Sequence, residues 1–303
     1  MSIEANRRFE QLGFIGLGVM GEPICRNLAT KSKLRVLAHD RDREPLERLK
    51  PSGVTSVDSV QAAARGSDVV FLSLPSGEVV HELAHQPQGL LETAMPGQII
   101  VDLSTSPVDV TRGLAREFAA RGASFVDAPV ARTRAAAEAG TLSVMVGAAP
   151  ELFSAIRDLL ATFASDVTLC GPVGCGQVVK ILNNMILFES VVAIAEAKAI
   201  GERAGVDAAL LFDTLSKGSA DSFALRNHGM KAVLADDFPD RAFSVEYARK
   251  DLRYALQLAQ ETRVEALGAQ TVETWFGRAV AAGEGQRYHP VISRLIGKPD
   301  GVA

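Results

Sequence analysis

The stretch Phe14–Gly21 reads Phe-Ile-Gly-Leu-Gly-Val-Met-Gly, directly after the apolar run Leu12–Ile15 and before a helical pattern at Glu22–Thr30. Its glycines have the spacing Gly-x-Gly-x-x-Gly. The first glycine permits a tight turn, the second lets the backbone approach a pyrophosphate, and the third lets helix and strand pack closely. The pyrophosphate then lies at a helix N-terminus, where N–H groups and the helix dipole favour negative charge. We therefore predict a dinucleotide-binding loop formed by Gly16, Leu17, Gly18, Val19, Met20 and Gly21.

An acid follows this loop at a spacing typical of dinucleotide sites. Asp40 stands 22 residues beyond Gly18 (40 − 18), where a carboxylate can hold the ribose hydroxyls of NAD. Arg41 beside it offers a guanidinium that can instead clamp the 2′-phosphate of NADP. The alternatives are a purely structural glycine turn and a solvated turn at Asp40–Arg43. The sequence thus favours NAD and leaves NADP open.

The first half of the chain alternates apolar runs with amphipathic segments, which predicts a mainly parallel sheet covered on both faces. The expected strands are Leu12–Ile15, Leu34–Ala38, Val69–Ser73, Ile99–Leu103, Ser124–Val126, Leu142–Val146 and Val167–Leu169. Ligands bind such sheets at the carboxyl ends of the strands. We accordingly expect the Leu74-Pro75 backbone near the cofactor and Thr105 near the nicotinamide ribose. Ser76 and Ser106 open the following helices and are candidate N-caps.

Bulk properties exclude several function classes. The chain has 303 residues, enough for two domains, 47% of them apolar, and a formal net charge of −4, which argues against nucleic acid and acidic membranes as partners. The N-terminal eight residues lack an apolar signal core, so we expect a cytoplasmic protein. Val178–Ile200 is apolar but interrupted by charged and amide residues, and we interpret it as a buried helix. We expect no metal.

A domain boundary is expected at Gly171-Pro172, because no convincing strand pattern follows it. This predicts a Rossmann-type doubly wound α/β domain over residues 1–171 and an all-α domain over residues 172–303, whose many apolar positions suggest a homodimer or homotetramer. In the second domain Lys180 and Asn184 are four residues apart on one helix face, next to Asn183. Gly176, one turn earlier, is expected to leave room for a ligand. The alternative is a lysine that extends to solvent.

Several of these segments occur together in one known family. The glycine loop, Asp102–Thr105, Asp127–Val130 with Gly140-Thr141-Leu142, and the Lys180 segment follow the order of the β-hydroxyacid dehydrogenases, which this chain resembles over nearly its whole length. The resemblance implies that Lys180 is the general acid/base, that Asn184 orients the substrate oxygen, and that Lys250 closes over the nicotinamide. It also implies no decarboxylation, because Leu187 stands where the 6-phosphogluconate enzymes carry a glutamate.

One segment departs from the family pattern. Positions 131–133 read Ala131-Arg132-Thr133 where the family usually has Ser-Gly-Gly to bind the substrate carboxylate. This variant is similar to the sulfolactaldehyde reductase branch, where the arginine holds a sulfonate, and a guanidinium suits multi-oxygen anions. The alternative is an arginine on a surface helix with Arg134 and Glu138.

We therefore expect an NAD(P)-dependent oxidoreductase that interconverts a small anionic semialdehyde and its hydroxy acid or sulfonate analogue. Sulfolactaldehyde is the first substrate candidate, and 3-hydroxyisobutyrate and tartronate semialdehyde are the others. The alternative of another class is a non-catalytic dinucleotide-binding module, which has no chemical reason to retain Lys180 with Asn184.

Overall fold

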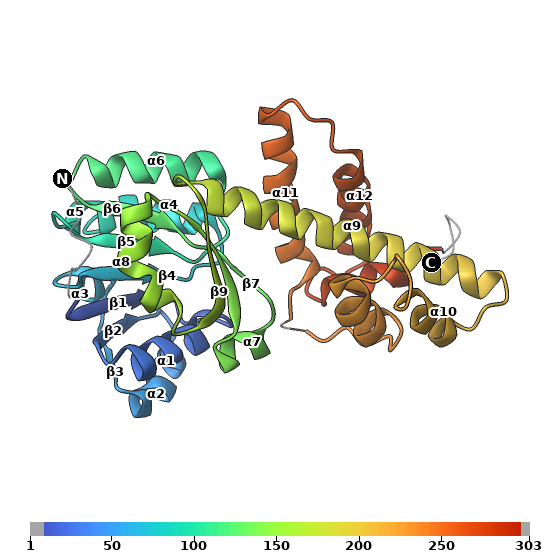
Figure 1. The fold of residues 1–303 in the computed structure, drawn as a ribbon, viewed down its shortest axis with the longest axis horizontal. Coiled ribbons are helices and arrows are strands. Elements are labelled where there is room, and N and C mark those ends of the chain that lie inside the picture. The colour runs from blue at the N-terminus through green and yellow to red at the C-terminus, as the bar shows by residue number, and fades with distance from the viewer. Residues whose placement is uncertain (1–8, 241, 298–303) are drawn as a thin grey trace. The chain divides into compact units, whose positions relative to one another are not determined.

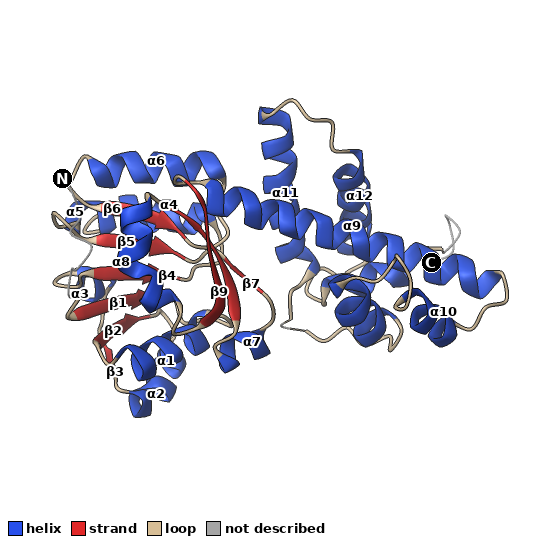
Figure 2. Ribbon diagram, in the orientation of Figure 1, coloured by secondary structure: helices blue, strands red, loops and turns tan. Residues whose placement is uncertain are grey.

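A computed structural model describes residues 9–240 and 242–297. The N-terminal eight residues, from which we expected a cytoplasmic protein, lie outside the described residues. The chain divides into two compact units, Met1–Lys180 (unit 1) and Ile181–Ala303 (unit 2). Unit 1 is a doubly wound α/β sheet and unit 2 is helical, as the sequence predicts (Figures 1 and 2).

The sheet of unit 1 has the strand order β3-β2-β1-β4-β5-β6-β8-β7, and β9 also pairs with β8. The strands from β3 to β6 are parallel, whereas β8 is antiparallel to β6 and β7. The bounds are β1 Gln11–Ile15, β2 Arg35–His39, β3 Val54–Ser56, β4 Val69–Leu72, β5 Ile99–Asp102, β6 Ser124–Asp127, β7 Val130–Ala131, β8 Leu142–Gly147 and β9 Ala164–Gly171. The seven predicted strands are therefore confirmed, and β3 and β7 are additional.

Helices cover both faces of this sheet. They are α1 Gly21–Ser32, α2 Arg43–Leu49, α3 Val60–Ala64, α4 Gly77–His85, α5 Leu90–Thr93, α6 Val108–Ala119, α7 Arg134–Ala139 and α8 Pro150–Leu160, with a 3₁₀ turn at Lys50–Ser52. Side chains along β4 alternate between two apolar clusters, Val69 and Phe71 in one, Val70 and Leu72 in the other. Because both clusters are buried, the strand is apolar without interruption, as expected of a parallel sheet covered on both faces.

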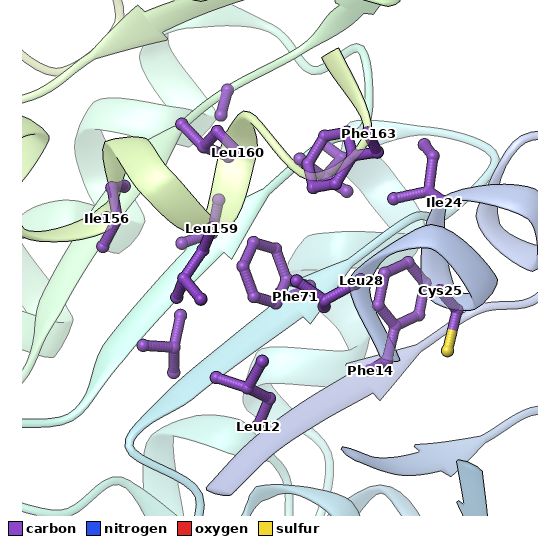
Figure 3. Packing of buried hydrophobic residues seen from close by; sticks show 14 of the residues in the cluster. Leu12, Phe14, Ile24, Cys25, Leu28, Phe71, Ile156, Leu159, Leu160 and Phe163 are labelled. Carbon is purple, nitrogen blue, oxygen red and sulfur yellow. The ribbon is translucent and has the colours of Figure 1, made fainter. Parts of the chain in front are cut away.

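One of these clusters fixes the helix that follows the glycine loop. Ile24 and Leu28 of α1 pack against Phe14 and Phe71 of the sheet, as Figure 3 shows. The rings of Phe14 and Phe71 are stacked with centroids 6.1 Å apart. This packing holds the N-terminus of α1 at the carboxyl end of β1.

Unit 2 is built from helices around its own apolar core. Its elements are α9 Cys175–Arg203, which begins in unit 1, α10 Ala208–Leu215, a π-helix at Leu225–Val233, α11 Val245–Glu261, α12 Leu267–Ala281 and a 3₁₀ turn at His289–Arg294. Within its described residues the extended pairing is limited to two isolated bridges, Asp240 with Arg287 and Ser244 with Tyr288.

The 29-residue helix α9 is long and apolar enough to cross a membrane by length and composition, and 33% of its most apolar window is buried in the fold. Phe188 and Val191 belong to the core of unit 2. Ile186 and Ile200, by contrast, are 59% and 68% exposed. The prediction of a buried helix is thus right for one face of α9 and wrong for another.

Candidate active site

The glycine loop between β1 and α1 has a different reason for glycine at each position. Gly16 has φ +94°, and a Cβ added there would lie 2.2 Å from the carbonyl oxygen of Ser73. A Cβ on Gly21 would lie 2.1 Å from the carbonyl oxygen of Gly16. A Cβ on Gly18 would meet no atom within 4 Å of the described structure. The first and third glycines are required by packing, and the second leaves open space where a pyrophosphate would lie.

The N-terminus of α1 fits the same ligand. Its N-cap residue, Met20, makes no side-chain capping hydrogen bond in the described structure, and the adjacent Val19 is 49% exposed. A helix N-terminus of this kind is favourable for an anion. The Asp40 carboxylate accepts from the backbone N–H of Leu17 at 2.5 Å and from that of Asp42 at 2.8 Å, while Arg41 is exposed. Asp40 therefore shapes the loop, and each of its oxygens has a second lone pair for a ribose hydroxyl.

The loops after β4 and β5 are tied together. The backbone N–H of Leu74 donates to Ser104 Oγ at 2.9 Å. Asp102, at the end of β5, accepts from the Ser104 N–H and from the Ser106 hydroxyl, both at 2.9 Å. Thr105 lies buried between these two serines, and Pro75 is exposed. The residues predicted to approach the nicotinamide thus belong to one hydrogen-bonded pair of loops.

The two predicted helix caps in these loops have different outcomes. Ser76 accepts from the backbone N–H of Val79 and caps α4, as predicted. Ser106 does not cap α6, whose N-cap is Pro107. The prediction was wrong because the Ser106 hydroxyl donates to the buried carboxylate of Asp102 instead.

Two carboxylates are buried at the carboxyl ends of β5 and β6. Burial raises the pKa of Asp102 to about 6, against the opposing effect of its hydrogen bonds from Ser104 and Ser106. Burial also raises the pKa of Asp127 to about 6, although the backbone N–H groups of Gly174 and Gln177 favour its ionised form. Both are ionised at neutral pH, at a cost in desolvation that the donors around them only partly offset.

Asp127 caps the helix that bears Lys180. The N–H of Gly174 donates to its Oδ1 at 2.7 Å and the N–H of Gln177 to its Oδ2 at 2.8 Å. A carboxylate satisfies N–H groups of the first turn and is favoured there by the helix dipole. Lys180, which is partly buried, follows three residues after Gln177.

Gly176 has a packing role that the sequence analysis did not foresee. A Cβ there would lie 2.4 Å from the carbonyl oxygen of Met145 and 2.8 Å from Asp127 Oδ2. The space beside Gly176, where we expected a ligand, is therefore filled by β8 and by the Asp127 carboxylate. The prediction is corrected on this point: the glycine lets α9 lie against the sheet.

Arg132 follows β7 in a left-handed backbone conformation, with φ +88°. Its guanidinium donates to the carbonyl oxygen of Thr141 at 2.6 Å, to Ser165 Oγ at 2.8 Å and to Asp166 Oδ2 at 2.7 Å. The arginine precedes α7 and does not lie on it, so the surface-helix alternative is wrong.

The neighbours of Arg132 are placed by the same segment. Ala131 is buried in β7, opposite Ser143 of β8. Thr133 caps α7 by accepting from the Ala136 N–H at 3.4 Å. Arg134 pairs with Glu138 within α7 at 3.0 Å.

Within unit 2, Asn184 is held by an acid on another helix. Its Nδ2 donates to Asp251 Oδ2 at 2.8 Å, and the Nδ2 of Asn183 donates to its Oδ1 at 3.1 Å. Lys250 Nζ lies 2.8 Å from Asp251 Oδ1 and 4.2 Å from the ring centroid of Tyr247. Because an ionised carboxylate only accepts, Asp251 fixes the amide of Asn184 in one orientation.

Four polar residues of the site received no role from the sequence: Asp102, Asp127, Gln177 and Asp251. A signal existed for two of them, since Asp102 and Asp127 each follow an apolar strand directly at the edge where ligands bind. Gln177 and Asp251 are ordinary polar residues on amphipathic helices, and only their partners distinguish them.

The chain matches two family models in succession. The NAD binding domain of 6-phosphogluconate dehydrogenase matches residues 11–171, and the NAD-binding domain of NADP-dependent 3-hydroxyisobutyrate dehydrogenase matches residues 174–296. The protein is therefore a nicotinamide-dinucleotide enzyme, in agreement with the fit of the glycine loop.

Proteins of named activity are similar to this chain over nearly its whole length. The chain is 33% identical to 2-(hydroxymethyl)glutarate dehydrogenase of Eubacterium barkeri, over 90% of this chain and 91% of that one. It is 31% identical to 2-hydroxy-3-oxopropionate reductase of Escherichia coli, over 94% and 97%. The solved structure of Mycobacterium tuberculosis 3-hydroxyisobutyrate dehydrogenase with L-serine superposes with a TM-score of 0.86 at 27% identity, covering 95% and 99%. The chain belongs to the β-hydroxyacid dehydrogenase family, which comprises NAD(P)-dependent dehydrogenases acting on CH–OH groups.

Proposed function

We propose that the protein interconverts a short-chain semialdehyde and its hydroxy acid, with Lys180 as the general acid/base. The observation that supports this most directly is the anchoring of the first turn of α9 by Asp127 at the carboxyl end of β6. That edge of a doubly wound sheet is where dinucleotides and their substrates bind. Lys180 follows on the next turn of the same helix.

The proposed reaction assigns a separate role to each of three residues, Lys180, Asn184 and Lys250. When bound, the nicotinamide supplies or accepts the hydride. Lys180 as ammonium donates a proton to the substrate oxygen as negative charge develops on it, and as neutral amine it accepts that proton in the oxidative direction. Asn184, oriented by Asp251, directs its amide toward the same oxygen. Lys250 is proposed to approach the nicotinamide end of the cofactor.

Lys180→Met tests the assignment. Loss of a general acid/base lowers turnover by about 10²- to 10⁴-fold, and dinucleotide binding should persist because the glycine loop is untouched. A variant that retains turnover would refute the role of Lys180. Absence of turnover by the parent enzyme on every small aldehyde, with both NADH and NADPH, would instead favour the non-catalytic module.

For the substrate we propose sulfolactaldehyde, on the strength of Arg132. A residue other than glycine in a left-handed backbone conformation is strained by roughly 1–3 kcal/mol. Arg132 adopts this conformation at a position where the family usually has glycine. A planar guanidinium that binds a sulfonate would give this strain a function. In this proposal the sulfonate replaces Asp166 as its partner.

A carboxylate substrate, such as 3-hydroxyisobutyrate or tartronate semialdehyde, is the second candidate. The observation that favours it is the engagement of the Arg132 guanidinium by Asp166, Ser165 and the Thr141 carbonyl. An arginine satisfied by its own chain has no need of a substrate anion, and the names of the two relatives concern carboxylic acids.

Two variants separate these substrates. If Arg132 binds a sulfonate, Arg132→Gly raises KM steeply for sulfolactaldehyde, and Asp166→Asn lowers it by releasing the guanidinium. If Arg132 is structural, both variants leave the KM of every substrate unchanged and alter only thermal stability. Initial rates with sulfonated and carboxylated three- and four-carbon aldehydes distinguish the outcomes.

We also propose a homodimer or homotetramer in the cytoplasm. The exposed apolar side chains of Ile186 and Ile200 on α9 and Leu210 on α10, which are 59%, 68% and 60% exposed, support self-association. Light scattering coupled to size exclusion gives the subunit number directly. A monomer at micromolar concentration would refute this.

A further inference from the structure

The side chain of Gln177 is fully buried in unit 1, and both ends of its amide are used. Its Oε1 accepts from the backbone N–H of Ser106 at 3.0 Å, and its Nε2 donates to the backbone carbonyl of Ser104 at 2.8 Å. The two bonds bracket Thr105. Because the amide has its acceptor at Oε1 and its donors at Nε2, glutamine fits this loop in a single orientation.

The backbone of the same residue is held by a different strand. The Gln177 N–H donates to Asp127 Oδ2 at 2.8 Å, whereas its side chain reaches the loop after β5. The loop after β5 is itself bonded to Asp102 and, through Ser104 Oγ, to the Leu74 N–H. One residue on α9 therefore joins the ends of β4, β5 and β6 into one hydrogen-bonded network.

We infer that Gln177 is a positioning residue, which fixes Lys180 relative to the Thr105 loop. The inference rests on the proposed role of Lys180. Lys180 is three residues further along α9, a rise of about 4.5 Å at 1.5 Å per residue. Any rotation or slide of the first turn therefore moves the amine directly. Asp127 alone restrains the axis of the helix at its start, and the Gln177 amide adds a restraint against rotation about that axis.

Gln177→Met removes both amide bonds and preserves the length of the side chain. The matched control is Gln98→Met, because Gln98 is also a buried glutamine of unit 1 and donates to the carbonyls of Ala64 and Ser67 at 2.8 and 2.9 Å. Gln98 lies outside the network of Gln177, so its replacement measures the cost of losing buried amide bonds alone.

Three measurements are made on the full-length proteins: amide hydrogen exchange of the apo protein, kcat with KM, and the primary isotope effect with NADH deuterated at the transferred position. For Gln177→Met we expect faster exchange at residues 104–106 and 174–180. We also expect a fall in kcat of about 10- to 100-fold, the usual cost of misplacing a catalytic group by about 1 Å, and a larger isotope effect. Gln98→Met should lower the melting temperature without changing any of these.

Unchanged kcat and isotope effect in folded Gln177→Met would overturn the inference, as would equal changes in Gln98→Met. If Gln177→Met fails to fold, Gln177→Asn keeps a neutral amide but is one methylene shorter, so it cannot reach both the Ser106 N–H and the Ser104 carbonyl, and the same expectations apply to it. Lys180→Met separates the two proposals. If that variant keeps turnover, the role of Lys180 fails. If it loses turnover while Gln177→Met keeps it, only the positioning role fails.

Discussion

The buried carboxylate of Asp102 makes the stability of unit 1 depend on pH, and Asp102→Asn isolates that dependence. In the variant, Oδ1 still accepts from the Ser104 N–H, and Nδ2 faces Ser106 Oγ, whose hydroxyl can rotate to accept. The substitution thus removes the charge and nearly preserves the shape.

The magnitude follows from the change in pKa. Burial raises the pKa of Asp102 from 3.8 to about 6. At about 1.4 kcal/mol per pKa unit, this corresponds to roughly 3 kcal/mol. Because the folded pKa lies above the unfolded one, the native state binds this proton more tightly than the unfolded chain. The resulting stabilisation is complete below the unfolded pKa of 3.8 and is lost as the pH rises through about 6.

The asparagine variant does not titrate, so its advantage should grow with pH. We expect the free energy of unfolding of Asp102→Asn minus that of the parent to increase by about 2 kcal/mol between pH 4 and pH 7.5, because part of the full stabilisation is already lost at pH 4. Urea unfolding should be followed by circular dichroism, because the single tryptophan, Trp275, lies on α12 and reports on unit 2.

The control is Asp158→Asn, which neutralises an exposed carboxylate on α8. It should leave the pH dependence of unfolding unchanged. Parallel pH profiles for the parent and Asp102→Asn would show that Asp102 does not carry a desolvation cost, and the reasoning would be refuted.

Further predictions concern the cofactor-binding loop and the residues that hold Asn184. Gly18→Ala should keep the melting temperature and weaken dinucleotide binding, measured by fluorescence titration, whereas Gly21→Ala should destabilise the fold because its Cβ meets backbone at 2.1 Å; equal effects of the two would contradict the roles assigned. Asp40→Ser should raise the ratio of kcat/KM with NADPH to kcat/KM with NADH, because it removes a carboxylate that repels a 2′-phosphate. An unchanged ratio would show that Asp40 does not select the cofactor. Asp251→Asn should lower kcat by about 10-fold, since the Asn184 amide loses a charged partner worth roughly 1.5–3 kcal/mol, and an unchanged kcat would remove Asp251 from the site.

Most of the fold could be predicted because local pattern determines it. Strand β4 is continuously apolar since both of its faces are buried, and this alone distinguishes it from an exposed strand. The glycine loop could also be predicted from the sequence, because its spacing follows from local requirements: Gly16 and Gly21 are required by packing, and Gly18 leaves open space for a ligand. Strand β3 was missed because only Val54 of its three residues is buried, which leaves no apolar run to detect.

The parts that escaped prediction depend on partners distant in the sequence. Asp127 caps a helix that starts nearly 50 residues later, and Ser106 has its hydroxyl drawn away from helix α6 by Asp102. Gly176 was expected to leave room for a ligand, but it packs against strand β8. In each case the residue type was visible in the sequence, but the neighbour that satisfies its hydrogen bonds or fills its space was not.

The tight packing of Gly147 and Gly176 around the Asp127 carboxylate, called the Asp127 socket below, has a consequence for building hybrid enzymes from this family. A Cβ on Gly147 would lie 2.3 Å from Asp127 Oδ1, and Gly176 is equally constrained, so strand β8, helix α9 and the carboxylate can be exchanged only together. A chimera joined in the linker between residues 171 and 174, where the two family models meet, would draw the carboxylate and its helix from different parents. A junction after Lys180 inherits the whole socket from one parent and is the better place to recombine substrate ranges.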